Sequence, residues 1–409
     1  MTEESGAPMA VARRTSRDIR SDSRLIVVRA LLAAGESTRA ALAEDTGLSP
    51  ATVSAVVGDL LGSGVAAEAG LLSGTVGRPT TGLRLNPDRG RVVGVYVEDR
   101  HFQATVFDAA LRRLANVHVT APAPVEAADD VIDRIARTLD TALAEAGASH
   151  EDVLGVGVLL PGGMQRPVKS ALAPDAIWLH LDRLRDRLGL PVVVDNPLKA
   201  IAAAELWLGA GRRCASVVVA NLGEGVGAGI VQDGAVVRGA TGTAGEWGHS
   251  LLVFDGRACQ CGRRGCAEAY VGVPGIRRTL AETAPGHPLL DVPLPGFAAA
   301  LAAAAESGDP AAASAVERTA HYLGAALADL VAIVNPEVIA LTGWAAAELG
   351  ALVLPVAERR VRDDAPGDAA ASLVIEPSHS SGMEGIAAIA LERFMRDAGL
   401  VTTRVLPAL

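Results

Sequence analysis

The stretch that decides the fold is residues 221–249, NLGEGVGAGIVQDGAVVRGATGTAGEWGH, together with residues 259–270, CQCGRRGCAEAY. Glycines punctuate an apolar, strand-like run, as they do both in tight sheet turns and in loops that hold phosphate. Three of the chain's four cysteines follow, and His249 precedes them. A Cys3His set with no spare position is typical of structural zinc sites. The spacing therefore predicts a zinc loop over residues 249–266.

We expect Zn²⁺ to be held by the four side chains His249, Cys259, Cys261 and Cys266. A redox pair is the first alternative, but it needs only two thiols and usually sits at a helix start. A zinc finger that reads DNA is the second. It needs a helix with outward basic residues after the loop, and Arg263 and Arg264 alone do not make one.

Two acids, Glu246 and Glu268, bracket this loop. With the imidazole of His249 they form a set of polar groups suited to a polyhydroxy ligand, because each desolvated hydroxyl needs a fixed partner. The alternative is that both acids are solvated. On the first interpretation, the metal keeps one wall of a ligand site rigid.

The chain has 409 residues, half of them apolar, and a formal net charge of −10. The length predicts two or three domains, and the charge argues against a general polyanion binder. Residues 1–90 contain ten Arg and ten acidic residues, so the whole negative excess lies after them. No apolar run is long enough for a membrane span, and the N-terminus has no signal-peptide core. We therefore expect a cytoplasmic protein without disulfides or a membrane partner.

The N-terminal region has the order helix, helix, turn, helix, hairpin. Residues 1–21 are expected to be a flexible arm, and residues 22–88 a winged helix-turn-helix. Ser49 followed by Pro50 is a strong helix-start signal. The third helix would lie in the major groove of double-stranded DNA and the hairpin in an adjacent groove.

We expect four residues of this region to contact the DNA operator. Thr52 and Ser54 lie on the outer face of the third helix, and Ser49 caps it. Arg78, in the hairpin tip GRP, suits insertion into a narrow minor groove. The alternatives are a helical bundle that binds protein, or a cap on the larger domain.

From residue 91 the pattern changes to alternating strands and helices, which predicts a mainly parallel, helix-covered sheet. Two similar halves are expected, near residues 91–200 and 214–390. Strands are predicted at VVGVYV, QATVF, VLGVGVLL, VVVD, SVVVAN, GAGIV and VIAL, and helices at 126–146, 198–209, 310–334 and 384–397.

The glycine-rich stretch and the spacing of His249, the cysteines and Glu268, with a winged helix ahead, resemble the ROK family of sugar kinases and repressors. The resemblance covers residues 22–395. It implies an α/β fold in which residues 91–409 form a two-lobed, actin-like (RNase H-like) domain with a sugar between the lobes. An N-terminal DNA-binding domain marks the regulator branch, which commonly forms homodimers or homotetramers.

Kinases of this family carry an Asp-x-Gly-x-Thr-like phosphate loop and an Asn-Asp-Ala-Asn motif whose Asp is the catalytic base. Here Tyr96 and Glu98 replace the first Asp and a Gly, and Pro197 replaces the base. Proline cannot accept a proton. The resemblance therefore implies that this chain is not an enzyme, with Asp195 a substitute base only if the backbone were displaced.

The same resemblance places a sugar against Asn196, Glu246, His249 and Glu268, with Asp175 where the family has an Asn. Lys199 replaces the second Asn of the motif. The ligand could then be an ordinary hexose, an anionic sugar or sugar phosphate, or none. The glycine-rich loop is interpreted as retained architecture, with residual nucleotide binding as the alternative.

The sequence thus predicts a transcriptional regulator, in most cases a repressor, that binds a sugar or related effector without phosphorylating it. One alternative is a sugar kinase with an appended DNA-binding domain, which would consume ATP. Another is a regulator that responds to a different metabolite or to a partner protein.

Overall fold

The computed structural model describes residues 16–72, 80–98, 100–123, 127–160 and 181–401. The chain divides into two compact units. The first contains residues 1–89 and 392–408, and the second contains residues 90–391 and Leu409. No helix in the described part of the chain is long and apolar enough to cross a membrane.

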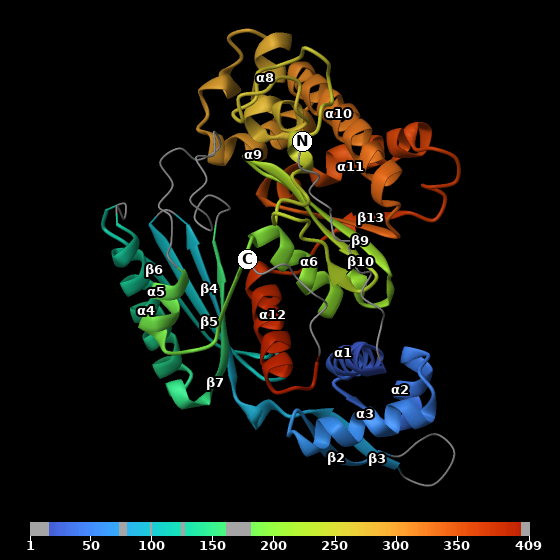
Figure 1. The fold of residues 1–409 in the computed structure, drawn as a ribbon. Coiled ribbons are helices and arrows are strands. Elements are labelled where there is room, and N and C mark those ends of the chain that lie inside the picture. Colours follow the sequence, from blue (N-terminus) through green and yellow to red (C-terminus); the bar gives the residue numbers. More distant parts are fainter. Residues whose placement is uncertain (1–15, 73–79, 99, 124–126, 161–180, 402–409) are drawn as a thin grey trace, which may run out of the picture. The chain divides into compact units, whose positions relative to one another are not determined.

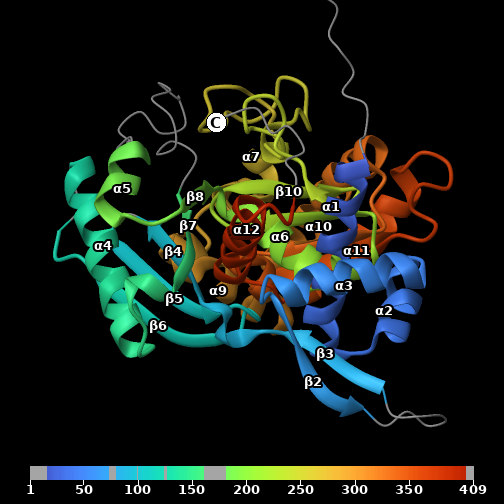
Figure 2. The same cartoon turned by 60° about the horizontal axis from the view of Figure 1, so that its bottom comes forward.

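In its described residues up to Arg89, the first unit is built from three α-helices and a small antiparallel sheet (Figures 1 and 2). The sheet has the order β1-β3-β2, and β2 and β3 form the expected hairpin. The elements are α1 Ser16–Ala34, β1 Glu36–Ser37, α2 Arg39–Thr46, α3 Pro50–Gly62, β2 Ala66–Leu72 and β3 Thr80–Leu85.

Polar side chains start two of these helices. Thr38 caps α2 by accepting a hydrogen bond from the Ala41 amide, and Ser49 caps α3 in the same way from the Thr52 amide. Apolar residues of α3 such as Val53 are fully buried. Helix α1 begins at Ser16, so the last residues of the expected flexible arm are helical. Their polarity does not oppose a helix, because the apolar face that follows supplies the packing.

The second unit contains two five-stranded sheets with the same strand order. The first is β6-β5-β4-β7-β8 and the second β11-β10-β9-β12-β13. Their strands are β4 Arg91–Glu98, β5 His101–Asp108, β6 Arg113–Thr120, β7 Val153–Leu159, β8 Val192–Asp195, β9 Ser216–Leu222, β10 Val226–Gln232, β11 Ala235–Val236, β12 Val338–Thr342 and β13 Val374–Pro377.

Both sheets are mixed, so the expectation of a mainly parallel sheet is wrong. The first three strands of each are antiparallel neighbours, and the last two pair in parallel. The reason is that tight turns join the first three strands, whereas helical connections precede the others. The seven predicted strands are all present, and the two similar halves correspond to the two sheets.

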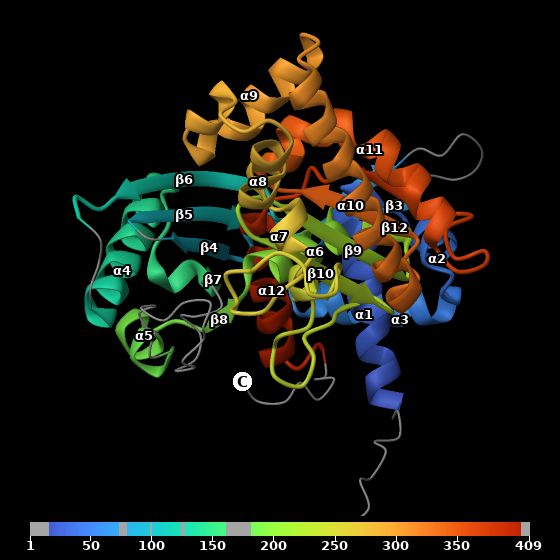
Figure 3. The same ribbon diagram turned by 90° about the horizontal axis from the view of Figure 1, so that it is seen from above.

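Helices cover the outer faces of the two sheets (Figure 3). Helix α4 packs on the first sheet, with Ile135 and Leu139 in a continuous apolar core. Helices α8 to α11 share the larger core of the second sheet. The covering helices are α4 Ala128–Glu145, α5 Leu181–Leu188, α7 Glu268–Val271, α8 Val273–Thr283, α9 Leu294–Glu306, α10 Pro310–Val334 and α11 Trp344–Asp364.

Two further helices, α6 Pro197–Trp207 and α12 Gly382–Asp397, pack on the inner faces. Helix α6 follows the first sheet in the chain but packs on β10 of the second. Helix α12 follows the second sheet but packs on β4 and β7 of the first. A Cβ atom at Gly157 of β7 would lie 2.5 Å from the carbonyl oxygen of Ile386, so only glycine permits this approach. Each sheet therefore receives its inner helix from the other half of the chain.

Candidate functional site

The sequence-predicted metal ligands lie together. The ligand atoms of His249, Cys259, Cys261 and Cys266 all lie within 4.8 Å of one another. The sulfur atoms of Cys261 and Cys266 are 3.6 Å apart, and Nδ1 of His249 is 3.7 Å from the sulfur of Cys259. Such a cluster can hold a metal ion. The fourth cysteine, Cys214, is half-buried before β9 and takes no part.

Backbone hydrogen bonds fix the shape of the loop between these ligands. Bridges join Leu251 to Cys266 and Ala258 to Arg264. Gly265 has a φ of +78°, and a Cβ atom there would lie 1.8 Å from the carbonyl oxygen of Val253. The loop is therefore closed on itself by its own backbone, and its tight turns require glycine.

The three thiols of the cluster differ in acidity. Burial raises the pKa of Cys259 to about 12. Burial acts in the same direction on Cys261, but hydrogen bonds from Arg263 and from the two neighbouring thiols outweigh it and lower its pKa to about 7. A bound cation would favour ionisation of all three, because metal ligation requires thiolates.

Glu268 ties the loop to the second sheet. One carboxylate oxygen accepts from the backbone amide of Val226 at 3.0 Å, and the other from the side chain of Gln260 at 2.9 Å. That second oxygen is also 3.9 Å from Nδ1 of His249. Glu268 is buried and Glu246 is exposed. The alternative that both acids are solvated therefore holds only for Glu246.

The amino end of α6 forms the other side of this region. Asn196 caps the helix by accepting from the Leu198 amide at 2.8 Å. Asp195 is buried, and its carboxylate pairs with the guanidinium of Arg238 through contacts of 2.5 and 3.1 Å. The pair joins the end of β8 in the first sheet to the segment after β11 in the second. No sequence signal marked Arg238, because it lies in an irregular segment.

Lys199, one turn into α6, is buried. Burial lowers the pKa of Lys199, while the nearby carboxylates of Asp195 and Glu246 oppose that shift. The charges of two cations, Lys199 and Arg238, and of two acids, Asp195 and Glu246, therefore balance one another beside Asn196.

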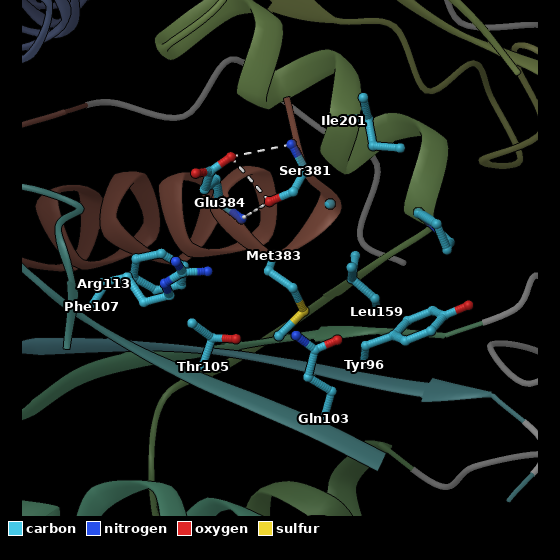
Figure 4. A pocket seen from close by; sticks show the side chains of 12 residues that line it. Tyr96, Gln103, Thr105, Phe107, Arg113, Leu159, Ile201, Ser381, Met383 and Glu384 are labelled. Atoms are coloured by element: carbon cyan, nitrogen blue, oxygen red, sulfur yellow. Dashed lines mark hydrogen bonds between the residues drawn. The ribbon is translucent and has the colours of Figure 1, made fainter. Parts of the chain in front are cut away.

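A pocket of about 390 Å³ lies between the first sheet and helices α6 and α12 (Figure 4). We call it the central pocket. Tyr96 and Pro197, which occupy the positions of the phosphate-loop Asp and of the base, both line it. Its lining residues are Tyr96, Gln103, Thr105, Phe107, Arg113, Leu159, Pro197, Ile201, Ser381, Gly382, Met383 and Glu384. None of the predicted ligand-binding residues is among them.

The predicted DNA-contacting residues lie on α3 or next to it. Ser49 and Ser54 are exposed and Thr52 is half-buried. The hydroxyls of Ser49 and Thr52 are 2.8 Å apart. Arg78 and Asp175 lie outside the described residues.

Comparison with known proteins gives the same picture. The ROK family matches residues 92–393. A glucokinase of Halalkalibacterium halodurans is 34% identical over 55% of this chain and 72% of its own length. A protein named putative xylose repressor, from a Caldicellulosiruptor species, is 28% identical over 84% of this chain and 88% of its own.

The crystal structure of a ROK family transcriptional regulator, homologous to the E. coli MLC protein, superimposes with a TM-score of 0.74. The superposition covers 95% of this chain and 100% of the regulator's chain, and the two sequences are 24% identical. The two five-stranded sheets thus have the actin-like ROK arrangement. With the family segment spanning both sheets and the metal cluster, the chain belongs to the ROK family.

Proposed function

We propose that this protein is a DNA-binding transcriptional regulator, of the repressor type, whose two lobes bind a sugar-like effector without phosphorylating it. The first unit is a winged helix-turn-helix in which α3 enters the major groove and the β2–β3 hairpin is the wing. The match to the xylose repressor spans more residues than the family segment contains, which supports a regulator with this additional unit.

The observation that carries the proposal is the outer face of α3. Its exposed residues are small, among them Ser54 and Ala55, so the helix can approach base edges closely. Its single acidic residue, Asp59, pairs with the guanidinium of Arg24. No unpaired carboxylate on α3 therefore opposes the phosphates. Ser49, Thr52 and Ser54 are the proposed contacts on this face, and Arg78 is proposed for the wing.

In the described part of the second unit, two positions that phosphoryl transfer would use carry unsuitable groups. Pro197 begins α6 at the position of the base and has no proton acceptor. Both carboxylate oxygens of Asp195 already accept hydrogen bonds, one from the Asn196 amide and the other from Arg238. Tyr96 stands in place of the phosphate-loop Asp, and burial raises the pKa of its phenol, which stays neutral. A neutral phenol is a poor ligand for Mg²⁺.

We propose that the His249 and cysteine cluster holds a structural zinc ion. With Zn–S bonds of about 2.3 Å and Zn–N bonds of about 2.0 Å, tetrahedral edges are roughly 3.5–3.8 Å long. The Cys261–Cys266 and His249–Cys259 separations of 3.6 and 3.7 Å fit these edges, and all the ligand atoms lie within 4.8 Å of one another. All four positions are filled by protein, so the ion would brace the loop and leave no place for a reacting water.

The effector site is proposed at Asn196, Glu246, His249 and Glu268, and Asp175 is proposed as a further contact. Glu246 precedes the short turn that carries His249, and Glu268 lies 3.9 Å from His249 Nδ1 while accepting from the Val226 amide of β10. An effector held there touches segments of both lobes. It would shift the lobe angle only by binding one shape more tightly than the other. In a homodimer that shift would change the spacing of two α3 helices on a pseudo-palindromic operator.

A sugar kinase with an appended DNA-binding domain is the second candidate function. The similarity to a glucokinase favours it, as does the glycine-rich turn between β9 and β10. Two assays on the purified full chain separate the candidates. Selection from a random duplex library should enrich one inverted repeat, and a coupled ATP assay with a hexose panel should show no turnover. Turnover without enrichment would establish the kinase instead.

A further inference from the structure

The central pocket has a chemistry different from that of the proposed effector site. We propose that it binds a second kind of small molecule, an amphipathic acid with one carboxylate or phosphate on a mainly apolar body. The pocket is lined by β4, β5, β6 and β7 on one side and by α6 and the start of α12 on the other. It therefore contacts both lobes.

Five apolar side chains form a large part of its wall. Phe107, Leu159 and Met383 are almost fully buried, and Ile201 and Pro197 add the surface of α6. In Figure 4 the side chain of Met383 extends from α12 into the pocket, on the side where Leu159 and Tyr96 lie. A sugar would leave hydroxyls unpaired against such a wall, and that is costly. An apolar body is favoured, because its burial releases water.

The charged side chains at the rim of the pocket determine which charge a ligand should carry. Arg113 is exposed and, within the described residues, its guanidinium has no hydrogen bond or ion pair. Glu384, the acid of the lining, accepts from the amide and hydroxyl of Ser381 at 3.1 and 3.0 Å. Glu384 keeps its charge but already accepts from Ser381, so the guanidinium of Arg113 is the charged group left to bind a ligand, and it fits carboxylate or phosphate through two parallel hydrogen bonds.

Two more polar side chains of the lining are held by Asn116 of β6. The amide nitrogen of Gln103 and the hydroxyl of Thr105 both donate to the same oxygen of Asn116, at 2.9 and 2.7 Å. The second N–H of the Gln103 amide is not used in these bonds and can donate to the carboxylate of a ligand. At 390 Å³ the pocket lies near the small end of the roughly 300–1,000 Å³ typical of ligand pockets, which limits the body to one or two rings or a short alkyl chain.

Calorimetry on the full chain tests the proposal with phenylacetate and octanoate as acid probes and 2-phenylethanol as the neutral probe. Both acids should bind at one site, and more tightly than the alcohol. Arg113→Gln should weaken acid binding by about tenfold and leave alcohol binding unchanged, because it removes one charge-assisted pair. The matched control is Arg112→Gln, an exposed neighbour outside the pocket, which should change neither.

Ile201→Phe, which fills the pocket, should abolish binding of all three probes, and circular dichroism checks that the variant is folded. Bound glucose should not displace the acids, so failure of this proposal is distinguishable from failure of the effector site. Three results would overturn it: no acid binding at 10 mM, roughly the weakest affinity worth assigning; equal affinity for acid and alcohol; or equal effects of the two arginine variants.

Discussion

Replacing Cys261 by Ser tests whether the metal loop stabilises the fold. Cys261 is half-buried, so a serine hydroxyl there can be solvated and adds no buried unpaired group. Any loss of stability in the variant then comes from the loss of the metal alone. The sulfur it removes lies 3.6 Å from that of Cys266, on one edge of the cluster.

The magnitude follows from linkage between binding and folding. A metal present at 100 to 1,000 times its dissociation constant stabilises the folded state by about 3–4 kcal/mol. At roughly 2–4 °C per kcal/mol for a large domain, the melting temperature should fall by about 10 °C. Because Glu268 joins the loop to β10, binding of any sugar effector should weaken as well.

The assay is elemental analysis of the purified protein together with differential scanning calorimetry. Cys214→Ser is the matched control, because Cys214 is also a half-buried thiol but lies outside the cluster. It should retain zinc and melt like the wild type. If Cys261→Ser keeps its zinc, or if a chelator-stripped wild type melts at an unchanged temperature, the structural role is wrong.

Three further changes probe other parts of the molecule. Ser54→Glu places a carboxylate on the exposed face of α3 and should weaken operator binding about tenfold or more at low salt, measured by fluorescence anisotropy. Asp195→Asn leaves the partly buried Arg238 without its counter-ion and should cost about 2 kcal/mol in urea unfolding. Gly157→Ala forces a methyl against the Ile386 carbonyl and should cost about 2 kcal/mol in thermal unfolding.

Each of these has a control. Ser307→Glu, an exposed site in the second unit, should leave DNA affinity unchanged. Adding Arg238→Met to Asp195→Asn should recover much of the lost stability, because the unpaired charge goes with it. Gly350→Ala in α11, where a Cβ atom meets nothing within 4 Å, should be neutral or stabilising. A Gly157→Ala protein as stable as the wild type would contradict the close packing of α12.

Local signals predicted much of the fold. VVVD became β8 and SVVVAN began β9, because each is a short apolar run; β9 is buried on both faces and β8 is partly buried. Strand β6 was not predicted, since most of its side chains are exposed and its pattern holds no buried run. Helix α11 was missed as well; Pro355 lies inside it, where proline usually ends a helix.

The candidate sites divide in the same way. The metal cluster could be predicted because Cys259, Cys261 and Cys266 are close in sequence, and one turn brings them together. The central pocket could not. Arg113 and Met383 meet there only because α12 crosses back onto the first sheet, and no local pattern records that return.

The crossing of α6 and α12 constrains how the molecule is made. The strands of residues 91–195 leave the ribosome long before the segment that will cover their inner face, at residues 382–391. Until then the inner face of the first sheet, which is apolar and contains glycines, is not covered. Such an exposed surface makes a folding intermediate prone to aggregation. A fragment that ends before α12 should therefore leave the inner face of the first sheet uncovered.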